Sequence, residues 1–210
     1  MPIDLTAMLA PERTAIVLQE VQRGVVGEGS VLPQLAEAAQ PALVNLARLL
    51  PAARTAGVPV VHCIAAFRGD RKGAGQNAPL FAGVSKQPGA AARLVVGSDD
   101  VLPAAELGPI PDTDLMSVRL TGVGPAWDTG LVAMLTNLGV RTVIAAGVSV
   151  NVGVTNLVMD CVNAGFSVVV PRDAVAGVPT DYAEAVISNT LRLLAAVTTT
   201  DKILEAWSTA

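Results

Sequence analysis

Six short runs of apolar, mostly β-branched residues restrict the possible folds of this chain more than any other feature. Each run is apolar almost throughout instead of alternating between apolar and polar residues. Continuous apolar runs of this kind are typical of strands that are buried on both faces of a parallel sheet. The predicted strands cover residues 14–18, 58–64, 115–120, 142–146, 167–170 and 196–199.

Helical patterns separate most of these runs, at residues 35–56, 129–138, 151–164 and 181–195. Pro41 is interpreted as a helical start, and Asp128 is expected to cap the second helix at its amino end. Alternating strands and helices indicate right-handed βαβ crossovers. The sequence therefore predicts a doubly wound α/β fold, one domain over residues 1–210, with a mainly parallel sheet of about six strands and helices on both faces. Ligands bind such sheets beyond the carboxyl ends of the strands.

Residues 67–111 depart from this alternation. The segment is rich in glycine, proline and charged residues and lacks a sustained helical or strand pattern. We interpret it as a long irregular excursion within the domain. Long loops of this kind commonly carry function, so the excursion is expected either to cover the ligand site or to contact another subunit.

Charge and composition narrow the class of partner. The formal net charge is −4 and the Lys and Arg residues are not clustered, whereas nucleic-acid binding needs a basic surface. The most apolar stretch, 143–159, is interrupted by polar residues and glycines, so it does not predict a membrane span. The first 14 residues lack a signal-peptide pattern, which predicts a cytoplasmic location. The expected partners are small molecules, with carboxylates among them, and further copies of this chain in a homo-oligomer.

No cofactor or metal ion is expected, because one His and two separated Cys make no ligand cluster and no phosphate-binding glycine motif follows a strand. Cys63 and Cys161 lie in apolar contexts that favour buried free thiols over a disulfide. His62 lies in an apolar strand and is interpreted first as a core residue, with a catalytic base as the alternative. Asp173 ends a strand, where it can orient a ligand or cap the next segment.

Three segments carry a more specific pattern. The first predicted strand is followed by Glu20-Val21-Gln22. The third contains Arg119 and is followed by Trp127-Asp128-Thr129-Gly130-Leu131. In residues 139–155, an apolar strand is followed by Gly147, Ser149 and Gly153. Together these segments resemble the isochorismatase-like (cysteine hydrolase) family, over roughly residues 13 to 200. The resemblance implies a hydrolase fold.

The resemblance also implies a catalytic centre at three positions. The usual family residues there are Asp, Lys and Cys, and this chain has Glu20, Arg119 and Gly153 instead. The chain thus resembles a divergent member that lacks the usual triad. A further implication is a nonproline cis peptide between Val148 and Ser149 beside the nucleophile position. Residues expected to contact the substrate are Val148, Ser149, Asn151 and Trp127.

These substitutions decide which chemistry remains. Gly153 has no side chain, so the Cys-dependent amidase mechanism is excluded. The resemblance includes isochorismatases that can have Gly at this position and hydrolyse a vinyl ether by protonation. A non-thiol hydrolase of a small carboxylate or vinyl ether would use Glu20 as acid and Arg119 as anion clamp, with the space beside Gly153 open to substrate or water. The alternative is a catalytically silent relative, in which Glu20 and Arg119 form a static ion pair and the chain binds a small ligand or a protein partner.

Overall fold

The computed structural model describes residues 4–87 and 89–208, so both ends of the predicted domain and residue 88 of the excursion lie outside the described residues. The strands form one sheet in the order β3-β2-β1-β4-β5-β7, with β6 paired to β4. Each pairing between these strands is parallel. The strands are β1 (Thr14–Gln19), β2 (Val60–Ala65), β3 (Leu115–Arg119), β4 (Thr142–Val148), β5 (Ser167–Pro171), β6 (Val175–Ala176) and β7 (Ala196–Thr198).

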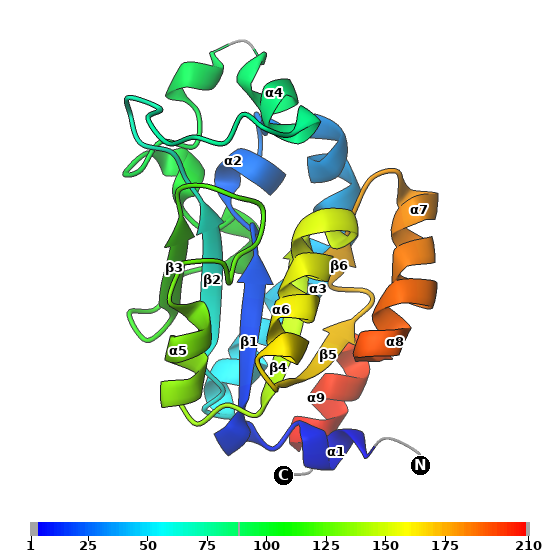
Figure 1. Ribbon diagram of the computed structural model, residues 1–210. Helices are drawn as coiled ribbons and strands as arrows, with labels where there is room; N and C mark the ends of the chain where they lie inside the picture. Colours follow the sequence, from blue (N-terminus) through cyan, green and yellow to red (C-terminus); the bar gives the residue numbers. More distant parts are fainter. Residues whose placement is uncertain (1–3, 88, 209–210) are drawn as a thin grey trace.

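Helices cover both faces of the sheet, with α5 and α6 in front of it and α3 behind it in Figure 1. The helices are α1 (Leu5–Met8), α2 (Arg23–Val26), α3 (Pro33–Thr55), α4 (Pro79–Ser85), α5 (Leu131–Asn137), α6 (Thr155–Asn163), α7 (Thr180–Ala185), α8 (Arg192–Leu194) and α9 (Thr200–Ser208). Two π-helical turns, Val150–Val154 and Val186–Leu191, precede α6 and α8. The predicted α/β fold with a parallel sheet between helical layers is confirmed. None of the described helices is long and apolar enough to cross a membrane.

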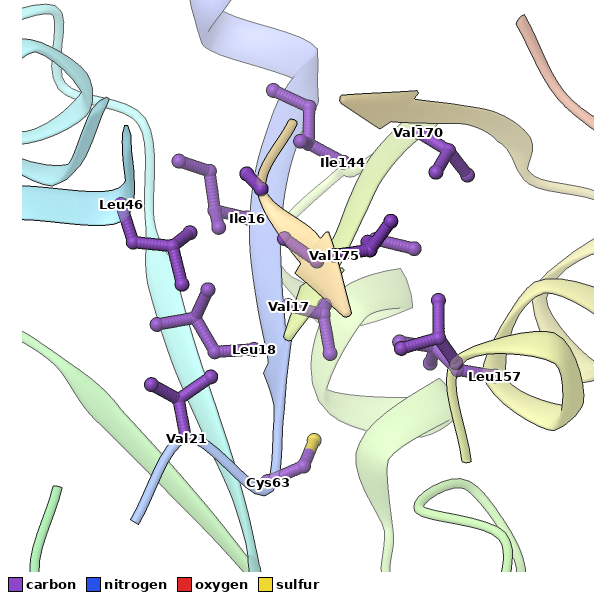
Figure 2. Close-up of a cluster of buried hydrophobic side chains, with 14 of the residues drawn as sticks. Ile16, Val17, Leu18, Val21, Leu46, Cys63, Ile144, Leu157, Val170 and Val175 are labelled. Atoms are coloured by element: carbon purple, nitrogen blue, oxygen red, sulfur yellow. The ribbon is translucent and has the colours of Figure 1, made fainter. Parts of the chain in front are cut away.

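Strand β1 lies at the centre of the core, and all six of its residues are buried. Successive strand side chains point to opposite faces. Accordingly, Figure 2 shows Ile16 and Leu18 on the side of Leu46 from α3, and Val17 on the side of Leu157 from α6. A strand that is apolar on both faces is therefore required here, which explains the continuous apolar run.

Helix α3 begins at Pro33, so the interpretation of Pro41 as a helical start is wrong. A proline is tolerated in the first turn because its missing N–H would have no partner there. Pro41 lies inside the helix although an interior proline costs about 3 kcal/mol. The helix continues through it because one of its faces is buried against the core, and each fully buried Leu contributes roughly 1.5–3 kcal/mol. That face includes Leu35, Leu43, Leu46, Leu49 and Leu50.

The expected cap of the second helix is also wrong. Helix α5 begins at Leu131 with Gly130 as its N-cap. Asp128 lies two residues before Gly130, outside the cap position. Thr129 supplies part of the missing cap, because its Oγ1 accepts a hydrogen bond from the Leu131 N–H at 3.3 Å.

The excursion contains α4 and three short 3-10 turns, Ala90–Ala92, Asp99–Val101 and Ala105–Leu107. Gln22, which is fully buried, ties it to the sheet. The Gln22 amide donates to the carbonyl oxygens of Ala65 at 2.9 Å and Asp100 at 3.2 Å, and its Oε1 accepts from the Ala65 N–H at 2.8 Å. Figure 1 places α4 beyond the carboxyl ends of β1 and β2, where a ligand is expected.

Candidate functional site

Glu20 and Arg119 meet at the carboxyl edge of the sheet. Glu20 follows the last residue of β1, Arg119 ends β3, and β2 lies between these two strands. The Arg119 Nη2 donates to Glu20 Oε1, and the two side chains are only 15% and 16% exposed. Glu20 has a φ of 52°, which is uncommon for a residue with a Cβ and is often found at functional sites. The chain thus brings together the two charged residues that the sequence singled out.

Arg119 has a second partner, since its Nη1 donates to the carbonyl oxygen of Gly122. Its positive charge already faces the Glu20 carboxylate. A carboxylate ligand would have to compete with Glu20 for this guanidinium. Arg119 is therefore less available as an anion clamp than the sequence suggested.

Gln19 is a site residue that the sequence reasoning missed. Its side chain is completely buried, and its Nε2 donates to Glu20 Oε1 at 2.8 Å. A Cβ added at Gly153 would lie 2.8 Å from Gln19 Nε2 and 3.0 Å from Gln19 Cγ. The Gln19 side chain therefore fills the space beside Gly153, and the expectation that substrate or water occupies it is wrong. The available signal was a polar residue at the end of an otherwise apolar strand.

The Glu20–Arg119 pair lines a cavity of about 70 Å³, which has room for a few water molecules or a small chemical group. The other lining residues are mostly apolar. The sheet edge and the α2–α3 region contribute Val25, Val31, Leu32 and Ala65. The excursion contributes Phe67, Leu80, Phe81, Val84 and Leu94. The excursion therefore covers this cavity, and its contact with another subunit stays a prediction.

Ser149 and Asn151 line a neighbouring pocket of about 420 Å³, which shares Val31, Leu32 and Leu80 with the first cavity. The Val148–Ser149 peptide is cis, as the resemblance implied. Val148 itself is buried in β4. The Asn151 Nδ2 donates to the Val178 carbonyl oxygen at 2.6 Å, so this amide helps to build the pocket wall. Ser149 and Asn151 are thus adjacent to the Glu20–Arg119 cavity without lining it.

Trp127 is not brought to either cavity. It is 75% exposed and lies in the segment between β3 and α5. The expected role in substrate binding has no support in this position, because an aromatic side chain contributes to a ligand site chiefly by burying its ring against the ligand.

His62 lies within β2 and belongs to a buried network with Asp114 and Arg54. Its Nε2 lies 2.9 Å from Asp114 Oδ2, which also accepts from Arg54 at 2.7 Å. Burial lowers the pKa of His62, against the opposing effect of Asp114. Burial alone would raise the pKa of Asp114, but hydrogen bonds from Arg54 and His62 outweigh it and hold that pKa below its usual value. The structure therefore supports the core interpretation of His62.

Asp173 has a capping role, although it caps helix α9 and not the segment that follows it in sequence. Its Oδ1 accepts from the Thr200 N–H at 2.8 Å and from the Thr200 hydroxyl at 3.0 Å. Thr200 begins helix α9. A carboxylate at a helix amino end satisfies a free N–H and interacts favourably with the helix dipole.

The two cysteines are free, buried thiols that line none of the cavities described above. Burial raises the pKa of Cys161 to about 12 and also raises that of Cys63, so neither thiol is a nucleophile near neutral pH. Within residues 4–87 and 89–208, no group of three or more His, Cys, Asp or Glu residues is placed to hold a metal ion.

Comparison with known proteins identifies relatives of this architecture. The chain is similar to a cysteine hydrolase from Pseudomonas syringae pv. phaseolicola, with a TM-score of 0.80 and 23% identity over 96% of this chain and 95% of that one. An isochorismatase family protein from Burkholderia thailandensis has a TM-score of 0.76 and 22% identity, over 94% and 96% of the two chains. N-carbamoylsarcosine amidase from Thermoplasma acidophilum has a TM-score of 0.70 and 17% identity, over 90% and 97%.

A search of curated proteins gave no match. The structural likenesses, at 23% identity or less, establish the fold alone. The sequence itself matches the model of the isochorismatase domain over residues 14–202, which is most of the chain. This chain therefore belongs to the isochorismatase family.

Proposed function

We propose that this chain binds a small, largely apolar molecule at the Glu20–Arg119 cavity and that it does so without the thiol chemistry of the cysteine hydrolases. The observation that carries the proposal is the position of the Gln19 side chain, which takes up the space a side chain at Gly153 would need. Gln19 also donates to Glu20. Both features support a site in which a fixed polar group has replaced the nucleophile.

The character of the cavity supports an apolar ligand with one polar end. Glu20 and Arg119 neutralise each other, and most of the remaining lining is aliphatic or aromatic. Sites of this kind gain affinity from apolar burial and orientation from a few polar groups. A ligand of more than a few atoms must extend from the small cavity into an adjoining pocket.

Acid-catalysed hydrolysis, with Glu20 as the proton donor, is a second candidate. The observation that favours it is the hydrogen bonding of the carboxylate: Arg119 and Gln19 both donate to Oε1. Among the described residues, Oε2 has no protein partner, so this oxygen is the one that can take up a proton from solvent and then deliver it to a ligand. Glycosidic and vinyl ether bonds are cleaved by carboxylic acids acting in this way.

The binding proposal is tested with a panel of small neutral and anionic molecules that includes benzamide and benzoate. Wild type, Glu20→Gln and Glu184→Gln are compared by thermal shift. Glu184 is the matched control, since it pairs with Arg172 at the surface, where its side chain is 52% exposed. We expect panel members to raise the melting temperature of wild type and Glu184→Gln and to lose this effect with Glu20→Gln. Equal stabilisation of all three proteins, or of none, would overturn the proposal.

The second candidate requires turnover. Isochorismate and a set of small amides are incubated with the same three proteins, and products are followed by chromatography. If Glu20 donates the proton, wild type and Glu184→Gln turn over a substrate and Glu20→Gln does not. Turnover that never exceeds the Glu20→Gln background leaves only the binding function.

A further inference from the structure

Arg71, in the excursion, has an arrangement that the proposed function does not explain. Its guanidinium lies over the ring of Phe67, 4.2 Å from the ring centroid. Its Nε donates to the Ala91 carbonyl oxygen at 3.3 Å, and its Nη2 donates to the carbonyl oxygens of Ala90 and of Arg93, the latter at 2.6 Å. Arg71 also has a φ of 59°. The side chain is thus held in one place by the aromatic ring and three carbonyl groups.

These partners are all uncharged. The adjacent acid, Asp70, accepts a bidentate pair of hydrogen bonds from Arg68, at 3.0 and 2.9 Å. Asp100 accepts a similar bidentate pair from Arg93, at 2.6 and 3.0 Å. Within the described part of the chain, no carboxylate pairs with Arg71, and its Nη1 has no protein acceptor. Burial lowers the pKa of Arg71, which reflects the cost of keeping this charge partly out of water.

Arg71 lines a pocket of about 190 Å³ next to the Glu20–Arg119 cavity. The two spaces share four lining residues: Phe67, Gly75, Phe81 and Val84. The ring of Phe81 packs directly against Gly75, where an added Cβ would lie 2.7 Å from it. Arg71 and Glu20 therefore line adjoining spaces that have these four residues in common.

We propose that Arg71 binds the anionic group of the ligand, a carboxylate in the first instance, while the apolar body of the ligand lies against Phe67 and Phe81. A guanidinium with unused N–H donors and no acid partner is the group best suited to a carboxylate. Arg119 is the weaker candidate because it already faces Glu20. The inference rests on the proposed function and adds a substrate class to it: small carboxylates with an apolar body.

Benzoate and benzamide are the matched probes, because they differ in charge and share the aromatic body. Dissociation constants are measured by NMR titration for wild type, Arg71→Met and Arg68→Met; Arg68 is the neighbouring control, exposed and paired with Asp70. We expect Arg71→Met to weaken benzoate by about tenfold or more, the effect of losing roughly 1.4 kcal/mol, and to leave benzamide within about twofold. Arg68→Met should change neither.

Two outcomes separate this inference from the proposed function. If Arg119→Met abolishes benzoate binding while Arg71→Met leaves it unchanged, the anion lies on Arg119; the inference is overturned and the binding function stands. If Glu20→Gln alters neither probe, the binding function fails instead. If Arg71→Met unfolds the protein, the Arg71 Nε–H resonance is followed in wild type instead. We expect this resonance to shift with benzoate and not with benzamide. An equal response to both probes overturns the inference.

Discussion

Substituting Gly153 with Cys would restore the thiol that the cysteine hydrolases use and would also test the packing of the site. The new Cβ would lie 2.8 Å from Gln19 Nε2, 3.0 Å from Gln19 Cγ and 3.2 Å from Gln19 Cδ. Gln19 is completely buried, so its side chain cannot move into solvent without losing its hydrogen bond to Glu20. We therefore expect Gly153→Cys to destabilise the fold and not to create an active enzyme.

The magnitude follows from the contacts. Overpacking a buried site costs typically about 1–3 kcal/mol, and the sulfur adds volume beyond the Cβ. For a domain of this size, each kcal/mol lowers the melting temperature by roughly 2–4 °C. Gln19→Ala removes the obstructing atoms, so the double variant Gln19→Ala/Gly153→Cys should be more stable than the sum of the two single effects predicts, by about 1 kcal/mol or more.

The assay is urea unfolding of wild type, both single variants and the double variant under reducing conditions. Gly83→Cys serves as the control for introducing a thiol, because a Cβ at Gly83 meets nothing within 4 Å. Single effects that add within about 0.5 kcal/mol, the limit for independent sites, would refute the argument that Gln19 fills the space beside Gly153. A Gly153→Cys protein as stable as wild type would refute it equally.

Two further predictions concern the buried titratable groups. Burial lowers the pKa of His62, so the unfolded protein takes up a proton on this side chain near pH 6.5 and the folded protein does so only at lower pH. The free energy of unfolding should therefore fall as the pH drops below about 6.5, by at most about 1.4 kcal/mol per pH unit. The His62→Gln variant should lack this slope. Parallel pH profiles of the two proteins would contradict it. Burial also raises the pKa of Cys161, to about 12, and that of Cys63. Near neutral pH, iodoacetamide should therefore label neither thiol in the native protein and both thiols in denaturant. Rapid labelling of the native protein, detected by mass spectrometry, would contradict this prediction.

The fold was largely predictable from the sequence because its strands are buried on both faces. That burial forces the continuous apolar runs, and the predicted strands 14–18 and 142–146 fall inside the observed β1 and β4. The errors occur where a local signal was outweighed. Pro41 lies within α3, as does Pro51, because the buried face of that long helix contributes more stability than its two interior prolines cost.

The site was predictable in its charged residues and not in its neutral ones. Glu20 follows β1 and Arg119 ends β3, two parallel strands that flank β2, so the topology places both residues at the same edge of the sheet. Gln19 was missed because strand alternation does not reveal that a polar side chain turns toward Gly153, which lies far away in sequence. Trp127 was assigned to the site by resemblance, and the backbone between β3 and α5 leaves it exposed.

The most direct test of a ligand site built around Glu20 is an NMR titration of wild type with benzamide, observing the Gln19 side-chain amide and the Arg119 Nε–H. Both groups adjoin the Glu20 carboxylate: Arg119 and the Gln19 amide donate to its Oε1. A ligand in this cavity should shift both resonances, with saturation at one common dissociation constant, and Glu20→Gln should abolish the response. Shifts confined to residues outside the cavity, while the Gln19 and Arg119 signals stay fixed, would contradict the account.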